Sequence, residues 1–193
     1  MKVPPFICLY DISQDSTLFK VLTIFNQLFK HTAQTELVIG ADEPIYLPHS
    51  ETGGLNRIVS TRDHLSSALH EISHWCIAGE QRRALVDYGY WYEADGRSES
   101  QQRQFESMEV KPQALEWLLS EACGQSFRLS VDNINQPLVR ASDTFRQAVC
   151  LQATQYFEEG LPERARIFHS SLLSEFNRHE TFSKSFFSYD KLV

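Results

Sequence analysis

The stretch Leu65-Ser-Ser-Ala-Leu-His-Glu-Ile-Ser-His-Trp-Cys-Ile-Ala78 decides how the rest of this chain is interpreted. It contains the pattern H-E-x-x-H at residues 70–74, and no proline or glycine interrupts it. Residues four apart on a helix lie on one face, so the imidazoles of His70 and His74 can bind one metal ion. Glu71 lies next to a ligand and can act at the metal without binding it. The stretch therefore predicts a metal-binding helix.

The surroundings of the motif favour this metal site over a plain helix that carries two histidines and a surface glutamate. The flanking residues are mostly Ala, Leu, Ile and Trp, which indicates a buried helix. Imidazole and carboxylate groups are costly to bury there without a partner.

Two histidines leave a metal ion short of ligands, because a catalytic ion takes three protein ligands and keeps one position open. The longer pattern H-E-x-x-H-x-x-G-x-x-H is absent, since Ile77 and Glu80 occupy its glycine and histidine positions. A carboxylate from later in the chain is the other source. We favour Glu109, because Pro112 suits the first turn of a helix and places Glu109 near a helix start, close to the core. Glu106 lies three residues earlier on the same helix face and stays the alternative ligand.

Two histidines and one carboxylate can serve two kinds of chemistry. Zinc with these ligands activates water for hydrolysis, with Glu71 as general base, as in a zinc-dependent H-E-x-x-H metallopeptidase. Iron(II) with the same ligands forms the facial triad that binds and activates dioxygen. The ligand types alone do not choose between the two.

The composition is that of an ordinary globular protein. The chain has 193 residues, of which 42% are hydrophobic and 22% charged, which suits one domain over residues 1–193. The net charge of −7, without any block of Lys or Arg, argues against direct binding of nucleic acid. No apolar run is long enough to cross a membrane, and residues 1–10 do not resemble a signal peptide. Four widely spaced cysteines are typical of reduced thiols, so we expect a cytoplasmic protein.

Hydrophobic periodicity predicts a helix-rich α+β domain in which a small sheet packs on the metal-binding helix. Helices are expected at residues 17–30, 65–78, 80–85, 110–122, 142–159 and 162–177. Strands are expected at residues 35–40, 55–60 and 127–131, and residues 42–48 should be extended because of their prolines. Residues 1–13 are expected to form a loose arm and residues 182–193 an unpatterned tail.

Many ordered segments besides the H-E-x-x-H motif resemble the elongation factor P hydroxylase family. These segments are DEPIYLP (42–48), NRIV (56–59), ALHEISHWCIAG (68–79), RR (82–83), LVD (85–87), GYWY (89–92), DGR (95–97) and EVKPQA (109–114), with an outlying GLPER (160–164). The similarity is dense over about residues 35–135.

The resemblance implies a zincin-like fold whose metal set works as a non-haem iron oxygenase. Members of the family hydroxylate the modified lysine of elongation factor P after a β-lysyl group has been attached to it. By this resemblance His70, His74 and Glu109 bind Fe(II), molecular oxygen is the co-substrate, and Glu71 positions the oxygen ligand or relays a proton. No pattern for 2-oxoglutarate binding is visible, and the sequence identifies no reductant.

A β-lysyl-lysine side chain presents two amines, so a site for it should offer carboxylates, together with aromatic rings for cation–π contacts. The candidate substrate-binding residues near the metal helix are Asp42, Glu43, Tyr46, Arg57, Asp87, Tyr90 and Trp91. Core packing is the alternative role for the aromatic residues, and a solvated loop position is the alternative for the acids. Arg57 is expected to pair with Glu71 or with an acidic loop.

Overall fold

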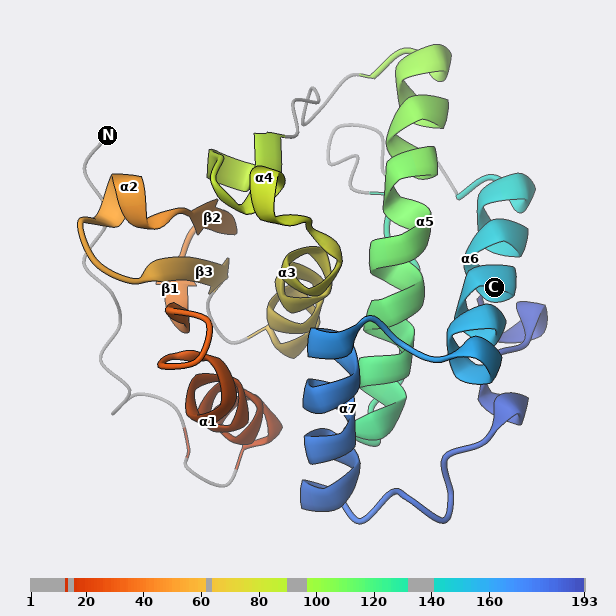
Figure 1. Ribbon diagram of the computed structural model, residues 1–193. Helices are drawn as coiled ribbons and strands as arrows, with labels where there is room; N and C mark the ends of the chain where they lie inside the picture. The colour runs from red at the N-terminus through yellow and green to blue at the C-terminus, as the bar shows by residue number, and fades with distance from the viewer. Residues whose placement is uncertain (1–12, 14–15, 62–63, 90–96, 132–140, 193) are drawn as a thin grey trace.

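The computed structural model describes residues 13, 16–61, 64–89, 97–131 and 141–192 (Figure 1). In these residues a small sheet lies on one side of helix α3 and the long helix α5 on the other. The main elements are α1 (Thr17–Phe29), β1 (Thr35–Ala41), β2 (Ile45–Leu47), α2 (His49–Thr52), β3 (Asn56–Thr61), α3 (Leu65–Ile77), α4 (Glu80–Arg83), α5 (Glu99–Ala122), α6 (Asp143–Glu159) and α7 (Glu163–Glu175). Three 3-10 helices are η2 (Val86–Gly89), η3 (Lys184–Phe186) and η4 (Tyr189–Leu192).

The sheet positions the metal-binding helix, because its central strand leads into α3. The strand order is β1-β3-β2. Strand β1 pairs with β3 in parallel, with Leu37 opposite Ile58, and β2 pairs with β3 in antiparallel register, with Tyr46 opposite the same Ile58. Strand β3 is therefore hydrogen-bonded on both sides, which fixes the point from which the chain continues to α3.

The face of α3 that turns away from α5 is anchored by aromatic side chains. Trp75 has no exposed surface, and its ring lies 5.2 Å from Phe25 and 4.9 Å from Phe29 of α1. Phe168 of α7 packs edge-on against Phe25 at 5.7 Å. Each such ring stabilises the fold by about 2–3 kcal/mol when fully buried. This packing leaves the His70 and His74 side of α3 facing α5.

A second hydrophobic cluster lies between α5, α6 and the C-terminal segment. Trp117 of α5 stacks on Phe127 at 5.4 Å and meets Phe187 edge-on at 5.4 Å. Phe187 and Leu192 are buried, so the tail contributes to this cluster although its sequence shows no periodic pattern.

The helix-rich α+β class is confirmed, but two predictions about the elements were wrong. Residues 127–131 form no strand, and the backbone of Ser130 bonds to a side chain of α5 instead of a neighbouring strand. Helix α5 begins at Glu99, so Pro112 lies inside the helix and Glu109 near its middle. A capping box formed by Ser98 and Gln101 starts the helix within a polar stretch that lacks hydrophobic periodicity.

The described residues bear on two expectations from composition, the lack of a membrane-spanning helix and the presence of reduced cysteines. None of the helices in these ranges has the length and apolar character that crossing a bilayer requires. Cys76 and Cys123 are buried free thiols, Cys150 is a half-buried one, and Cys8 lies outside the described residues. Burial raises the pKa of the Cys76 and Cys123 thiols to about 12, so both stay protonated at neutral pH.

Candidate metal centre

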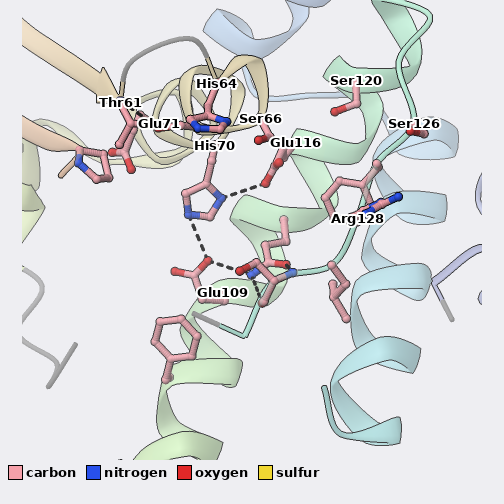
Figure 2. Close-up of a pocket in the computed structure, with 17 residues that line it drawn as sticks. Thr61, His64, Ser66, His70, Glu71, Glu109, Glu116, Ser120, Ser126 and Arg128 are labelled. Atoms are coloured by element: carbon pink, nitrogen blue, oxygen red, sulfur yellow. Dashed lines mark hydrogen bonds and ion pairs between the residues drawn. The ribbon is translucent and has the colours of Figure 1, made fainter. Parts of the chain in front are cut away.

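Three potential ligands converge in the space between α3 and α5. His70 and His74 come from successive turns of α3, and Glu109 comes from α5. The Nε2 atoms of the two imidazoles are 3.1 Å apart. Glu109 Oε1 lies 3.2 Å from His74 Nε2, and Glu109 Oε2 lies 3.5 Å from His70 Nε2. Figure 2 shows the His70 ring pointing from α3 toward the Glu109 carboxylate.

These distances fit a single transition-metal ion. Metal bonds to imidazole nitrogen and carboxylate oxygen are about 2.0–2.2 Å long, so adjacent ligands on one ion lie roughly 3.0–3.5 Å apart. The separations at this site, 3.1 Å between the two Nε2 atoms and 3.2 and 3.5 Å from these atoms to the two oxygens of Glu109, fall in that range. Two imidazoles and one carboxylate on the same side of an ion also leave coordination positions open for other ligands.

Glu106, the alternative ligand, has a different set of contacts. Its Oε2 accepts a hydrogen bond from Ser142 Oγ at 2.6 Å, and its Oε1 accepts one from Ser142 N at 3.4 Å. Ser142 in turn caps α6 by accepting a hydrogen bond from Phe145 N at 3.1 Å. Glu106 thus ties the start of α6 to α5, and Glu109 is the glutamate that lies against the two imidazoles.

Two further side chains of α5, which sequence reasoning missed, contact two of the three potential ligands, His70 and Glu109. Glu116 Oε2 lies 2.9 Å from His70 Nδ1. Gln113 Nε2 donates to Glu109 Oε2 at 3.3 Å and to the carbonyl of Ser130 at 2.8 Å, and Gln113 Oε1 accepts from Ser130 N at 3.0 Å. Gln113 therefore connects the Glu109 carboxylate to the chain that follows α5.

A sequence signal for these residues exists in the spacing of polar side chains along α5. Five buried polar residues recur at intervals of three and four, and they are Glu106, Glu109, Gln113, Glu116 and Ser120. Such spacing places them on one helix face, next to apolar residues on the other faces. A buried polar stripe needs partners, so this pattern indicates a functional surface rather than a solvated one.

The carboxylates dominate the electrostatics of the metal-free site. Burial alone lowers the pKa of His70, but the nearby charges of Glu109 and Glu116 outweigh it and raise the pKa to about 10. Burial alone raises the pKa of Glu109, yet the charges of His74 and His70 bring it down to about 2. The site is therefore built to hold positive charge, which suits a metal cation.

Glu71, the predicted catalytic residue, lines the same pocket as His70 and Glu109. Burial raises the pKa of Glu71, and the positive charges of His70 and His74 only partly oppose this shift. This is the direction in which burial shifts the pKa of a carboxyl group that serves as a general acid or base.

A pocket of about 620 Å³ opens onto this cluster, a size typical of sites that bind small molecules or side chains. Its polar wall includes His70, Glu71, Glu109 and Glu116 (Figure 2). Other parts of the lining come from the loop before β2, from α5 and from the chain after α5, and include Pro44, Phe105, Phe127 and Arg128. The two phenylalanines are aromatic walls that the sequence analysis did not single out.

The predicted acidic contacts are placed in two ways. Asp42 and Glu43 are exposed and immediately precede Pro44, which lines the pocket. Asp87 is half-buried, and its Oδ1 accepts a hydrogen bond from Tyr46 N at 2.7 Å. Asp42 and Glu43 are therefore next to a pocket residue in the chain and open to solvent. The carboxylate of Asp87 is instead occupied by a hydrogen bond to the backbone of β2.

The structure does not support two of the other expected contacts. Tyr46 has no exposed surface; its ring stacks on Tyr88 at 4.4 Å, and its hydroxyl donates to the carbonyl of Arg83 at 2.9 Å. Core packing therefore accounts for this ring. Arg57 pairs with Glu36 on the neighbouring strand at 2.9 Å, because the parallel register places these two residues opposite each other. Tyr90 and Trp91 lie outside the described residues.

Comparison with known proteins agrees with the resemblance noted in the sequence. The family model described as elongation factor P hydroxylase matches residues 24–187. An elongation factor P lysine hydroxylase of Haemophilus influenzae is 49% identical over 162 residues, which cover 83% of this chain and 89% of that protein. The match includes α3 and α5, and hence His70, His74 and Glu109.

Proposed function

The chain belongs to the elongation factor P hydroxylase family, and on this premise we propose that it hydroxylates a lysine of elongation factor P. The observation that carries the proposal is the 49% identity to a protein named for that activity, over most of both chains. The site adds chemical support, because two imidazoles and a carboxylate converge beside a pocket large enough for a long side chain.

We propose Fe(II) as the metal, held by His70, His74 and Glu109. The donor set supports this choice, since two histidines and one carboxylate form the facial triad of iron oxygenases. The bound iron would supply the binding and activation of molecular oxygen. Hydroxylation inserts one oxygen atom into a C–H bond and reduces the other to water, so a reductant must deliver two electrons and two protons are consumed.

The proposed role of Glu71 is to move a proton at the site. Its carboxyl group lies beside His70 in the pocket wall, and burial raises its pKa toward the range in which acid–base groups work. Glu109 and Glu116, which line the same pocket, are only 4% and 6% exposed.

We propose that the substrate is lysine that already carries a β-lysyl group. Phe105 and Phe127 in the pocket lining suit the aliphatic part of such a chain. Asp42 and Glu43, exposed beside Pro44 at the pocket, suit its terminal amines. These two acids are the predicted substrate contacts that the geometry supports best.

Three wider proposals accompany this function. Residues 1–193 form one domain, because α5 contributes side chains to both hydrophobic clusters. The fold is zincin-like, an assignment supported by a metal helix that packs against a small sheet and meets a third ligand from a later helix. The reaction takes place in the cytoplasm, where translation occurs.

The family match favours the hydroxylase over the zinc metallopeptidase that the H-E-x-x-H motif also allows.

The decisive experiment is mass spectrometry of elongation factor P from cells with and without this protein. The modified lysine should lack the mass of one oxygen atom when the protein is absent. Cells that carry His70→Ala should resemble the deletion, and cells with His31→Ala, an exposed histidine outside the site, should resemble wild type. An oxygen increment that persists in the deletion refutes the proposal.

Metal analysis of anaerobically purified protein tests the choice of iron. We expect iron to copurify with wild type and with Glu106→Gln, and to be lost from Glu109→Gln. Stoichiometric zinc that supports cleavage of a peptide would contradict the oxygenase and favour the peptidase.

A further inference from the structure

We infer that Glu116 is a positioning residue, which fixes the His70 ring so that Nε2 is presented to the metal. The inference rests on the metal site proposed above and assigns a role to a residue outside the three ligands. Its basis is the contact between Glu116 Oε2 and His70 Nδ1, 2.9 Å long, in a part of the pocket where Glu116 is only 6% exposed.

The contact determines which nitrogen of His70 is free to bind a metal. When Glu116 is ionised its carboxylate can only accept a hydrogen bond, and His70 Nδ1 is then the donor in this contact. In the neutral imidazole Nε2 then carries the lone pair, and this is the atom 3.1 Å from His74 Nε2 and 3.5 Å from Glu109 Oε2. Figure 2 shows the ring between the carboxylates of Glu116 and Glu109, with one contact to each.

Helix α5 supplies both of the carboxylates that contact His70, those of Glu109 and Glu116. Glu109 and Glu116 are seven residues apart, two turns along one face of the same helix, and Gln113 between them bonds to Glu109. A single rigid element thus sets the distance between the ligand carboxylate and the carboxylate that holds the imidazole. Sites that are built on helices hold such geometry more closely than sites on loops.

Glu116 is not placed as a fourth ligand. Its carboxylate lies at Nδ1, whereas the converging atoms lie around Nε2, on the far side of the ring. The group of ligands that can share one ion consists of His70, His74 and Glu109 in the part of the chain that the structure describes. A carboxylate on the outer nitrogen of a metal-binding histidine raises the basicity of the ligand and fixes its orientation.

Cobalt(II) is a suitable probe, because it occupies sites of this type and its visible spectrum reports ligand geometry. The variants are Glu116→Gln and Glu116→Ala, measured by cobalt titration and by competition with zinc. We expect affinity to fall about 10- to 100-fold, the range found when such supporting groups are removed. Glu116→Gln should lose less cobalt affinity than Glu116→Ala, because the Oε1 atom of the glutamine can still accept a hydrogen bond from His70 Nδ1. The cobalt band should shift in Glu116→Ala.

Glu106→Gln is the matched control. Glu106 lies on the same helix, has the same 6% exposure, and is also hydrogen-bonded, but its partner is Ser142 of the α6 cap. Removing that buried charge should leave cobalt affinity and spectrum as in wild type. Circular dichroism establishes that each variant is folded, and Glu116→Gln carries the test if Glu116→Ala does not fold.

The positive controls separate this inference from the metal site itself. If His70→Ala and Glu109→Gln lose cobalt while the Glu116 variants bind it as wild type does, the role of Glu116 is refuted and the metal site stands. If His70→Ala and Glu109→Gln also bind as wild type does, both are refuted. A raised KM for substrate with unchanged metal affinity in Glu116→Gln likewise overturns the inference, because it indicates a substrate contact.

Discussion

The carboxylates around His70 favour its doubly protonated, positively charged imidazolium form when no metal is bound. Burial opposes this charge, but Glu109 and Glu116 raise the pKa of His70 to about 10. A metal ion needs the unprotonated Nε2, so metal binding at pH 7 must release about one proton from the site. Titration calorimetry in buffers of different ionisation enthalpy should show this release, and metal affinity should rise with pH up to about 10. Binding without proton release would contradict the pairing seen here.

The pKa of His169 on α7 is lowered, in contrast to that of His70. Burial, with a smaller effect of His179, lowers its pKa to about 4, and its Nε2 is buried without a hydrogen-bond partner among the described residues. Between pH 6.5 and 4 the unfolded chain therefore binds more protons at this residue than the folded one, so the protein loses stability as pH falls through that window. The loss amounts to at most about 3 kcal/mol.

Replacement of this histidine tests the assignment. The ring already packs edge-on against Phe182 at 4.7 Å, so His169→Phe keeps an aromatic contact while removing the titrating group. Urea unfolding at pH 7 and pH 4.5 should show a smaller loss of stability for the variant than for wild type. An equal loss in both proteins would assign the acid sensitivity to other groups.

Asp42 and Glu43 can be tested together as contacts for the substrate amines. Both side chains are exposed, so each charge interacts with an amine across solvent and contributes modestly, about 0.2–1 kcal/mol. The double variant Asp42→Asn, Glu43→Gln should raise KM by roughly 2- to 30-fold with little change in kcat. Steady-state kinetics at low and high salt provide the check, since the effect should shrink as salt increases. A fall in kcat at constant KM would exclude this role.

At the scale of elements, α3 depends on the aromatic cluster behind it. Phe25 has no exposed surface and contacts Trp75, Phe29 and Phe168. Phe25→Ala should reduce the free energy of unfolding by about 3–5 kcal/mol, as for other buried phenylalanines. Leu151→Ala on α6 is the control, because Leu151 is 70% exposed and its loss should change stability by less than about 0.5 kcal/mol. Comparable losses in urea unfolding would show that the cluster is not the anchor of α3.

The two long site helices also show what the sequence could predict. Helix α3 was found from H-E-x-x-H and its apolar flanks, because its residues are both helix-forming and periodic. Hydrophobic periodicity does not predict the start of α5, because residues 98–106 are polar and Pro112 favours a first turn. The predicted position of Glu109 near a helix start is therefore wrong, although Glu109 does lie at the two imidazoles.

The sequence alone does not predict contacts between side chains that are distant in the chain. The link from Glu116 to His70 spans 46 positions in the chain, and it depends on how α3 and α5 are packed together. The surroundings of Tyr46 and Arg57 depend on such packing too. A tyrosine in a strand can face a pocket or the core, and the parallel register places Arg57 opposite Glu36, with which it pairs.

At the scale of the whole molecule, the candidate site joins the two parts of the core. Helix α3 belongs to the cluster around α1 and α7, whereas α5 also packs into the cluster with α6 and the C-terminal segment. A metal ion held by His70, His74 and Glu109 therefore links α3 to α5 across their interface. An ion that binds only the folded chain stabilises it, by about 2.7 kcal/mol at a concentration one hundred times Kd.

Thermal unfolding with and without metal measures this link. For a chain of this length, stabilisation of that size should raise Tm by about 5–10 °C, and a chelator should reverse the shift. The shift should vanish in His74→Ala, which removes a ligand from α3, and in Glu109→Gln, which removes the one from α5. Glu106→Gln should keep it, because that carboxylate bonds to the α6 cap and not to the imidazoles. A shift of the same size in the ligand variants would mean that the ion acts elsewhere on the protein, and α3 and α5 would then be held together by packing alone.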